Sequence, residues 1–122
     1  MMQKKEAMSY DCICFNCLAY EFDPTKLKET ERKIKSRLRY RGAGPYDQAR
    51  VEYIRRFRDD LYREFAAPAE SKYYSKTDSE FSSPDDFNIE MMTEDYSCIY
   101  NLIDAGGMRQ MILFAAYLYY LR

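Results

Sequence analysis

Four cysteines are the residues of this 122-residue sequence best suited to specific chemistry. Cys12, Cys14 and Cys17 lie close together, and Cys98 lies far along the chain. Thiolates at short spacing can converge on one zinc ion or iron–sulfur cluster, with a distant cysteine as fourth ligand. However, the spacing differs from paired CxxC motifs, and free cysteine commonly packs as a small buried hydrophobe. We therefore expect buried, reduced thiols and keep a small cysteine-coordinated metal-binding protein as an alternative.

The sequence contains no histidine, which is the commonest general base in enzymes and a frequent metal ligand. Its absence excludes every catalytic triad that operates through imidazole. The acids between positions 85 and 95 lack the spacing of an EF-hand, and neither glycine pair continues into a phosphate-binding motif. We therefore expect a protein that is not an enzyme and uses no cofactor.

Lysine and arginine are concentrated in one part of the chain, although the net charge is only −1. Residues 24–58 carry 12 basic and 4 acidic side chains, whereas residues 59–122 carry 12 acidic and 5 basic ones. This asymmetry favours an acidic protein partner, a nucleic acid, or ion pairs within the chain. Because a dedicated nucleic-acid-binding domain is usually clearly basic, that function is the less favoured alternative. Its phosphate contacts would come from Lys26, Lys28, Arg32, Lys33, Arg37, Arg39, Arg41, Arg55, Arg56 and Arg58.

These basic residues are expected to lie on a helical hairpin at 24–67. Asp23 is suited to cap the first helix and Pro24 to occupy its first position. The helix has a thin apolar stripe and ends at a Gly/Pro turn, residues 42–45. A second helix, expected at about 46–67, has a broader apolar face. The short connection predicts that the two helices pack antiparallel to each other.

The remaining chain divides into a loop and C-terminal helices. Residues 68–92 are rich in Ser, Tyr and Asp without a sustained period, which predicts a long surface loop. Residues 93–122 predict helices, the first with Ile99 and Leu102 on its apolar face and an end near the double glycine at 106–107. The last segment is hydrophobic on nearly every side, so it needs shelter in its own core or in a partner. It is too short to be a transmembrane segment.

The N-terminal part is the least determined by its pattern. Residues 10–22 are dense in apolar side chains, but at this length periodicity does not separate a strand from a buried helical turn. Together the segments predict one domain over residues 1–122, mainly all-α. We expect a small three- to four-helix bundle with a long loop and a short irregular or strand-like N-terminal segment. Without a secretory signal pattern, an intracellular and most simply cytoplasmic location is expected.

These features favour a non-enzymatic protein-binding role, as a subunit, adaptor or small inhibitor of a larger complex. The 13 tyrosines suit a binding surface, although a half-buried structural role is the commoner one for tyrosine. The charge asymmetry provides a face that could steer an acidic partner. The expected contacts are Ile112, Phe114, Tyr117, Leu118 and Tyr120 of the hydrophobic segment, and Arg37, Arg41, Arg55 and Arg56 of the basic segment.

Overall fold

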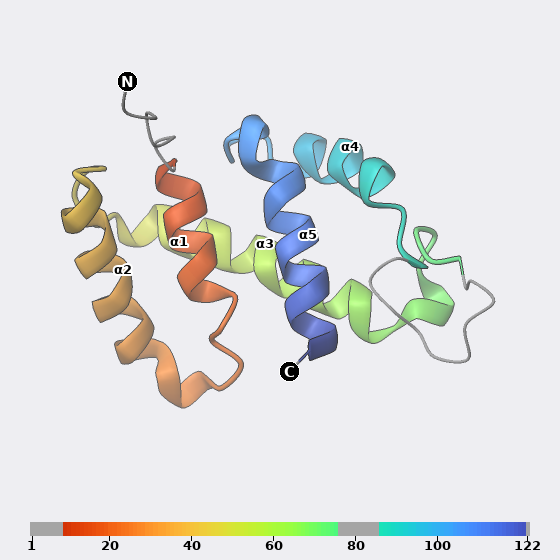
Figure 1. Cartoon of the computed structure of the whole chain (residues 1–122), viewed down its shortest axis with the longest axis horizontal. Helices are drawn as coiled ribbons and strands as arrows, with labels where there is room; N and C mark the ends of the chain where they lie inside the picture. Colours follow the sequence, from red (N-terminus) through yellow and green to blue (C-terminus); the bar gives the residue numbers. More distant parts are fainter. Residues whose placement is uncertain (1–8, 76–85, 122) are drawn as a thin grey trace, which may run out of the picture.

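The computed structural model describes residues 9–75 and 86–121. Within these ranges the chain forms five α-helices and no strand, which confirms the all-α prediction (Figure 1). The helices are α1 (Tyr10–Leu18), α2 (Leu27–Arg41), α3 (Gln48–Ala66), α4 (Ile89–Ile99) and α5 (Ala105–Leu121). Short 3-10 turns, Pro24–Lys26 and Pro68–Glu70, precede α2 and follow α3. The buried hydrophobic residues of all five helices belong to one cluster.

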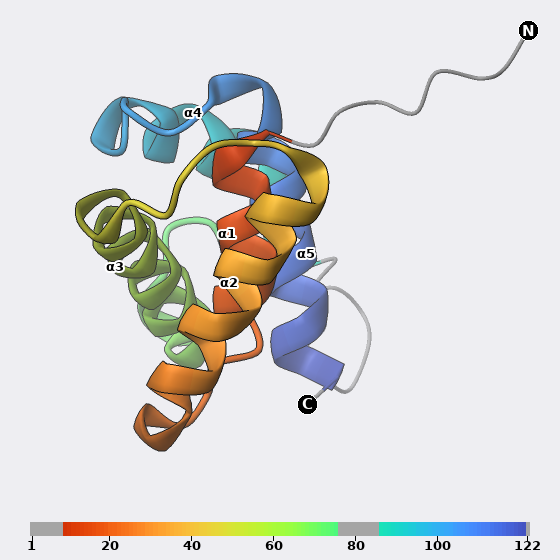
Figure 2. The same ribbon diagram turned by 90° about the vertical axis from the view of Figure 1, so that its left-hand side faces the viewer.

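The short helix α1 lies at the centre of the fold. Figures 1 and 2 show it between α2 and α5 and in front of α3, and it packs against all three. Cys14, Phe15 and Leu18 are fully shielded from solvent. The Phe15 ring packs against Phe57 of α3, with 5.4 Å between ring centroids. Helix α1 therefore joins α2, α3 and α5.

The N-terminal segment expected to be irregular or strand-like is thus a helix, and that prediction was wrong. The backbone N–H of Cys12 donates to the Ser9 hydroxyl at 3.1 Å, which caps the first turn. The segment shows no clear amphipathic period because three neighbouring helices surround it, so apolar residues are needed on most of its sides.

Both helices predicted within residues 24–67 are present. The Asp23 carboxylate accepts a hydrogen bond from the Thr25 N–H at 3.0 Å, and Gly42 ends α2 with a left-handed φ of 62°. However, α2 packs mainly on α1, and α3 packs on α1 and α5. The apolar stripe of α2, with Ile34 and Leu38, is buried in this arrangement. Helix α1 therefore occupies the position where a direct hairpin contact was expected.

The loop expected at 68–92 is shorter than its pattern indicates. Helix α4 begins before the predicted start at 93, because the Asn88 side chain caps it by accepting from the Met91 N–H at 3.0 Å. Tyr74 and Phe87 form an isolated antiparallel bridge that joins the two sides of the loop. The central part of the predicted loop, residues 76–85, lies outside the described residues.

The double glycine does not separate two helices as expected. It lies in the first turn of α5, and the chain turns earlier, between Ile99 and Ala105. Gly107 is buried against α1, where a Cβ atom would lie 2.5 Å from the Sγ atom of Cys12. Close packing of α1 and α5 therefore requires glycine at this position.

A buried carboxylate fixes this turn to the rest of the fold. Asp11 accepts from Nε and Nη2 of Arg50 at 2.9 and 2.7 Å, and from the backbone N–H of Asp104 at 2.8 Å. Asp11 is only 3% exposed, so its charge depends on these donors. The contact joins α1, α3 and the start of α5.

Candidate protein-interaction surface

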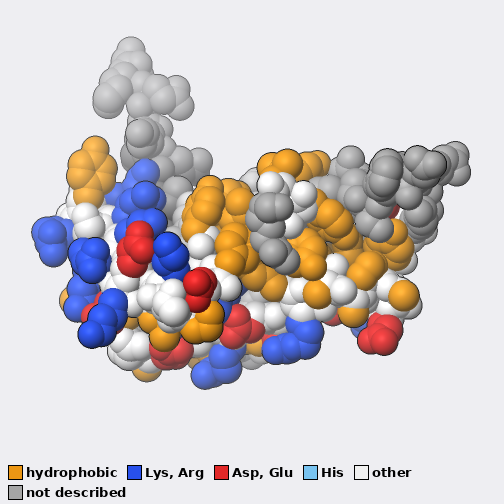
Figure 3. Space-filling view, turned by 90° about the horizontal axis from the view of Figure 1, so that it is seen from below, with side chains coloured by type: hydrophobic (Ala, Val, Ile, Leu, Met, Phe, Trp, Pro, Cys, Tyr) orange, Lys and Arg blue, Asp and Glu red, His pale blue; other side chains and the backbone are white. Residues whose placement is uncertain are grey.

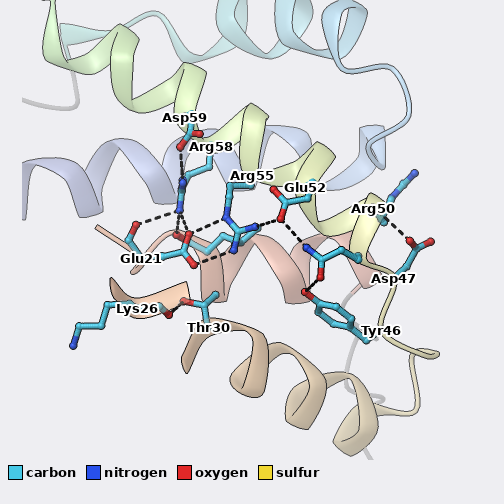
Figure 4. A network of polar contacts seen from close by, with 12 residues as sticks. Glu21, Lys26, Thr30, Tyr46, Asp47, Arg50, Glu52, Arg55, Arg58 and Asp59 are labelled. Carbon is cyan, nitrogen blue, oxygen red and sulfur yellow. Dashed lines mark hydrogen bonds and ion pairs between the residues drawn. The ribbon is translucent and has the colours of Figure 1, made fainter. Parts of the chain in front are cut away.

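Two arginines expected to be free for a partner are bound inside the molecule. Glu21, which follows α1, accepts from Nε and Nη2 of Arg55 at 2.9 Å each and from Nη1 of Arg58 at 2.8 Å (Figure 4). Arg55 also donates to Glu52 at 2.6 Å, and Arg58 donates to the carbonyl oxygen of Leu18 at 3.0 Å. Arg55 and Arg58 therefore hold α3 against the end of α1, so Arg55, which was expected to contact a protein partner, and Arg58, which was expected only for the nucleic-acid alternative, are engaged within the fold.

Electrostatics favour the charged forms of Glu21 and Arg55 in this network. Burial alone would raise the pKa of Glu21, but hydrogen bonds from Arg55 and Arg58 outweigh it and lower that pKa. Burial likewise opposes the charged form of Arg55, yet the hydrogen bonds that it donates to Glu21 and Glu52 raise its pKa above the ordinary value. The contact of Glu21 with Arg55 is thus an ion pair that stabilises the packing of α3 against the end of α1.

The basic residues of α2 have a different environment. Glu29 pairs with Lys26 and Lys33 at 3.8 Å, and Glu31 pairs with Lys35 at 2.8 Å. The other cations of α2 are exposed and have no ion pair within the described ranges: Lys28, Arg32, Arg37, Arg39 and Arg41. In Figure 3 lysine and arginine gather at the left end, where α2 lies. This uncompensated positive charge faces solvent.

Two of these arginines border a hollow between α1 and α2, which we call the α1–α2 groove. Its volume is about 340 Å³. It is lined by Ile13 and Asn16 of α1 and by Ser36, Arg37, Tyr40 and Arg41 of α2. Tyr40 is 86% exposed, the highest exposure among the large hydrophobic side chains described. Sequence reasoning missed Tyr40, although its position beside Arg37 and Arg41 on a basic helix was visible.

The hydrophobic helix α5 has one side in the core and one side at the surface. Ile112, one of the expected partner contacts, is fully buried and belongs to the core. On the other side, Tyr117 is 42% and Leu121 79% exposed, and Phe114 and Leu118 are half-buried.

Tyr20, after the end of α1, continues this hydrophobic surface. It is 57% exposed, and its ring lies edge-on to Phe114 with 6.0 Å between centroids. We call the set of Tyr20, Phe114, Tyr117, Leu118 and Leu121 the α5 apolar patch. Hydrophobic side chains also gather in the middle of the face drawn in Figure 3. Tyr20 and Leu121 were missed from the sequence, because helix ends give no periodic signal.

Two other expected contact residues lie elsewhere. Tyr120 is half-buried and packs on Phe87 and Tyr119, with centroid distances of 6.4 and 5.3 Å. Arg56 is exposed on α3, where its guanidinium lies over the Tyr53 ring at 5.8 Å. Neither residue lines the α1–α2 groove or belongs to the α5 apolar patch.

Helix α4 has exposed hydrophobic residues that were expected to be covered. Ile99 and Leu102 are each 62% exposed, and Met91 is 37% exposed, whereas Ile103 is buried. The helix ends at Ile99, so the predicted apolar face does not continue through Leu102. These side chains are a useful comparison for the α5 apolar patch, because they are hydrophobic and exposed but lie on α4 and the turn that follows it.

The cysteines do not converge on a common point. Successive helical residues are rotated by about 100°, so Cys12, Cys14 and Cys17 point in different directions from α1. Cys14 and Cys17 are buried as expected, Cys12 is half-buried, and Cys98 is exposed on α4, contrary to expectation. Burial raises the pKa of the Cys14 thiol to about 12. The described residues contain no group of three or more metal-ligating side chains, which leaves the metal alternative without a site there.

Comparisons with family models, with curated proteins and with solved structures found no match. Among the described helices, none combines the length and the hydrophobicity needed to cross a membrane. The α5 apolar patch and the α1–α2 groove are therefore the features of the molecule from which a function is inferred.

Proposed function

We propose that this chain is a non-enzymatic protein-binding protein, a subunit, adaptor or small inhibitor that acts through the α5 apolar patch. The observation that carries the proposal is the exposure of three large side chains that belong to the α5 apolar patch. Tyr20, Tyr117 and Leu121 are 57%, 42% and 79% exposed. Clustered exposed hydrophobic residues of this kind are typical of interaction sites.

The composition of the patch also suits a protein interface. Tyrosine provides a large rigid ring and a polar hydroxyl, and it is enriched among residues that dominate binding energy. Covering a side chain such as Leu121 completely is worth about 1.5–3 kcal/mol. Two or three such residues supply about 3–9 kcal/mol, so the patch would be the centre of a larger interface that offsets the costs of association.

Affinity purification from the native source tests this proposal. The bait proteins are the wild type, a Tyr117→Asp/Leu121→Asp variant, and a Leu102→Asp control that places a charge on the exposed surface beyond α4. We expect the double variant to lose the partner and the control to keep it, with both variants retaining the wild-type circular dichroism spectrum. Equal recovery of the partner by the wild type and the double variant would contradict the proposal.

Nucleic-acid binding is the second candidate function, favoured by the unpaired cations of α2. The cations that were expected to contact phosphate included Arg55 and Arg58, but both of these side chains are bound to Glu21. The exposed arginines Arg37, Arg39 and Arg41 would still release counterions from phosphate, so affinity should fall steeply with salt. Titration of a labelled oligonucleotide at low salt tests this function, and an absence of binding would exclude it.

A further inference from the structure

The surface between the start of α2, α3 and the end of α5 contains a hydrophobic hollow of about 470 Å³, which we call the Tyr62 pocket. Phe22 stacks on Tyr62 with 5.4 Å between ring centroids, and Tyr62 packs on Tyr119 at 5.8 Å. The hydrophobic lining of the pocket therefore comes from three parts of the chain: Phe22, Pro24 and Leu27 on the way into α2, Tyr62 and Ala66 of α3, and Tyr119 of α5.

The charged residues that line the Tyr62 pocket are compensated within the chain. Each of the five has an ion-pair partner: Glu21 with Arg55 and Arg58, Asp59 with Arg58, and Arg63 with Asp60. A charged occupant would lose hydration there without meeting an unpaired counter-charge. The pocket therefore suits uncharged, hydrophobic side chains.

The Tyr62 pocket and the α5 apolar patch are neighbours on the surface. Tyr20 of the patch contacts α5, whereas Phe22, two residues later, stacks on α3 in the pocket. Helix α5 joins the two features again at its C-terminal end, where Tyr119 lines the pocket and Leu121 belongs to the patch. Figures 1 and 2 show the connection from α1 to α2 and the C-terminal end of α5 in the lower part of both views.

Together the two features expose about as much hydrophobic surface as one side of a protein dimer. Five of the nine exposed large hydrophobic side chains among the described residues belong to them, at exposed fractions from 42% to 79%: Tyr20, Phe22, Leu27, Tyr117 and Leu121. Because an aromatic side chain has about 150–250 Å² of surface, the five together expose roughly 500 Å². One side of a standard interface covers about 800 Å², of which about 65%, or roughly 520 Å², is apolar in homodimers.

We propose that a second copy of this chain binds this surface, so that the α5 apolar patch of each copy covers the Tyr62 pocket of the other. This inference rests on the proposed function and names the partner. The pocket requires uncharged, exposed side chains, and the chain itself presents Tyr117 and Leu121 next to it. A two-fold axis makes the same contact twice, because each surface then meets its own copy in both directions.

The basic surface of α2 does not suit such a pairing. A two-fold axis through it would bring Arg37 and Arg41, which have no ion pair within the described ranges, toward the same residues of the other copy, where like charges repel. An acidic protein or a nucleic acid would find its counter-charges on α2 and not in the Tyr62 pocket. The hydrophobic surface is therefore the one suited to a second copy.

Sedimentation equilibrium of the purified chain tests the inference. We expect the wild type to be a dimer at about 100 μM. The patch variant, Tyr117→Asp/Leu121→Asp, and the pocket variant, Leu27→Asp/Ala66→Lys, each alter one side of the contact. Each should raise the dissociation constant of the dimer at least about tenfold, because charges would be buried without partners. Higher salt should not weaken the dimer, because the contact is hydrophobic.

The matched control is Ile99→Asp/Leu102→Asp, which places two charges on exposed hydrophobic positions of α4 and the turn after it. This control should change the dissociation constant by less than about threefold, because it alters only the net charge. The pocket variant should remain folded, since Leu27 and Ala66 are exposed and the new charges suit the start of α2 and the end of α3. Circular dichroism verifies the folding of every variant.

A mixture of the patch variant and the pocket variant tests the reciprocal arrangement. The mixed dimer keeps one of the two contacts, since the intact patch of one copy meets the intact pocket of the other, whereas each variant alone keeps neither. Native mass spectrometry should therefore find the mixed dimer above the share of about half that random pairing gives.

Several results would overturn the inference. These are a wild type that is monomeric at about 100 μM, equal losses in the patch variant and the control, a dimer that salt weakens, or mixed dimers at the random share. If a different protein from the native source depends on Tyr117 and Leu121, the proposed function survives each of these failures. If neither a second copy nor another protein depends on them, the proposed function fails as well.

Discussion

Replacement of Glu21 by Gln should remove a large part of the stability of this fold. The side chain of Glu21 is 2% exposed, and those of its partners Arg55 and Arg58 are 14% and 9% exposed. Glutamine keeps the shape but removes the charge, and its amide group presents N–H donors where the arginines also donate. The guanidinium groups of Arg55 and Arg58 would then share one amide oxygen in place of the two carboxylate oxygens of Glu21.

The expected loss can be bounded from these contacts. Breaking a buried ion pair by removing one partner costs about 3–5 kcal/mol. Here Arg55 keeps Glu52 and Arg58 keeps Asp59, so we expect about 2–3 kcal/mol. Urea unfolding followed by circular dichroism measures this change. The matched control is Glu31→Gln, in which the exposed pair with Lys35 is lost and no measurable change is expected.

The stabilities of the wild type and of Glu21→Gln should depend differently on pH. Because the folded-state pKa of Glu21 is lowered, its contribution is complete above the unfolded-state pKa of about 4.3. It is lost as the pH falls from there through the lower folded-state pKa. The stability difference between the wild type and Glu21→Gln should therefore close on acidification. A loss below about 1 kcal/mol at neutral pH, or a difference independent of pH, would refute the reasoning.

Two further predictions follow from the packing of α1. Gly107→Ala should lower the free energy of unfolding by about 1–3 kcal/mol, measured by urea unfolding, because its Cβ would collide with Sγ of Cys12. Gly106→Ala, whose Cβ would meet nothing closer than 3.6 Å, should be tolerated, and equal effects would contradict the packing. A thiol reagent should modify exposed Cys98 within the native protein, whereas Cys14 should react only on unfolding. Fast native reaction of Cys14 would show that α1 is not the core.

Local signals in the sequence were sufficient for part of the fold. Asp23 and Pro24 mark the start of the helical region that includes α2, and Gly42 marks its end, because capping chemistry depends on a few adjacent residues. Helix α1 was ambiguous because nine residues surrounded by other helices show no period. The double glycine was misleading because its cost within a helix is only about 1 kcal/mol per residue, and close packing against α1 outweighs it.

The candidate surface required the tertiary structure. Arg41 and Arg55 look alike in the sequence, and only the contact of Arg55 with Glu21, 34 positions away, removes it from the surface. Ile112 and Tyr117 likewise lie on one hydrophobic helix, whose pattern does not reveal which side faces the core. Contacts between residues far apart in the sequence therefore decide which of the predicted contact residues are exposed at the surface.

Site-specific photo-crosslinking in the native source tests the central claim most directly. A photoreactive phenylalanine analogue is placed at Tyr117 or Tyr20 in the α5 apolar patch, or at Leu102 as an exposed hydrophobic control. We predict that one partner protein crosslinks to positions 117 and 20, and that position 102 gives none. Crosslinking at 102 alone, or no protein crosslinked at 117, would contradict the assignment of this surface.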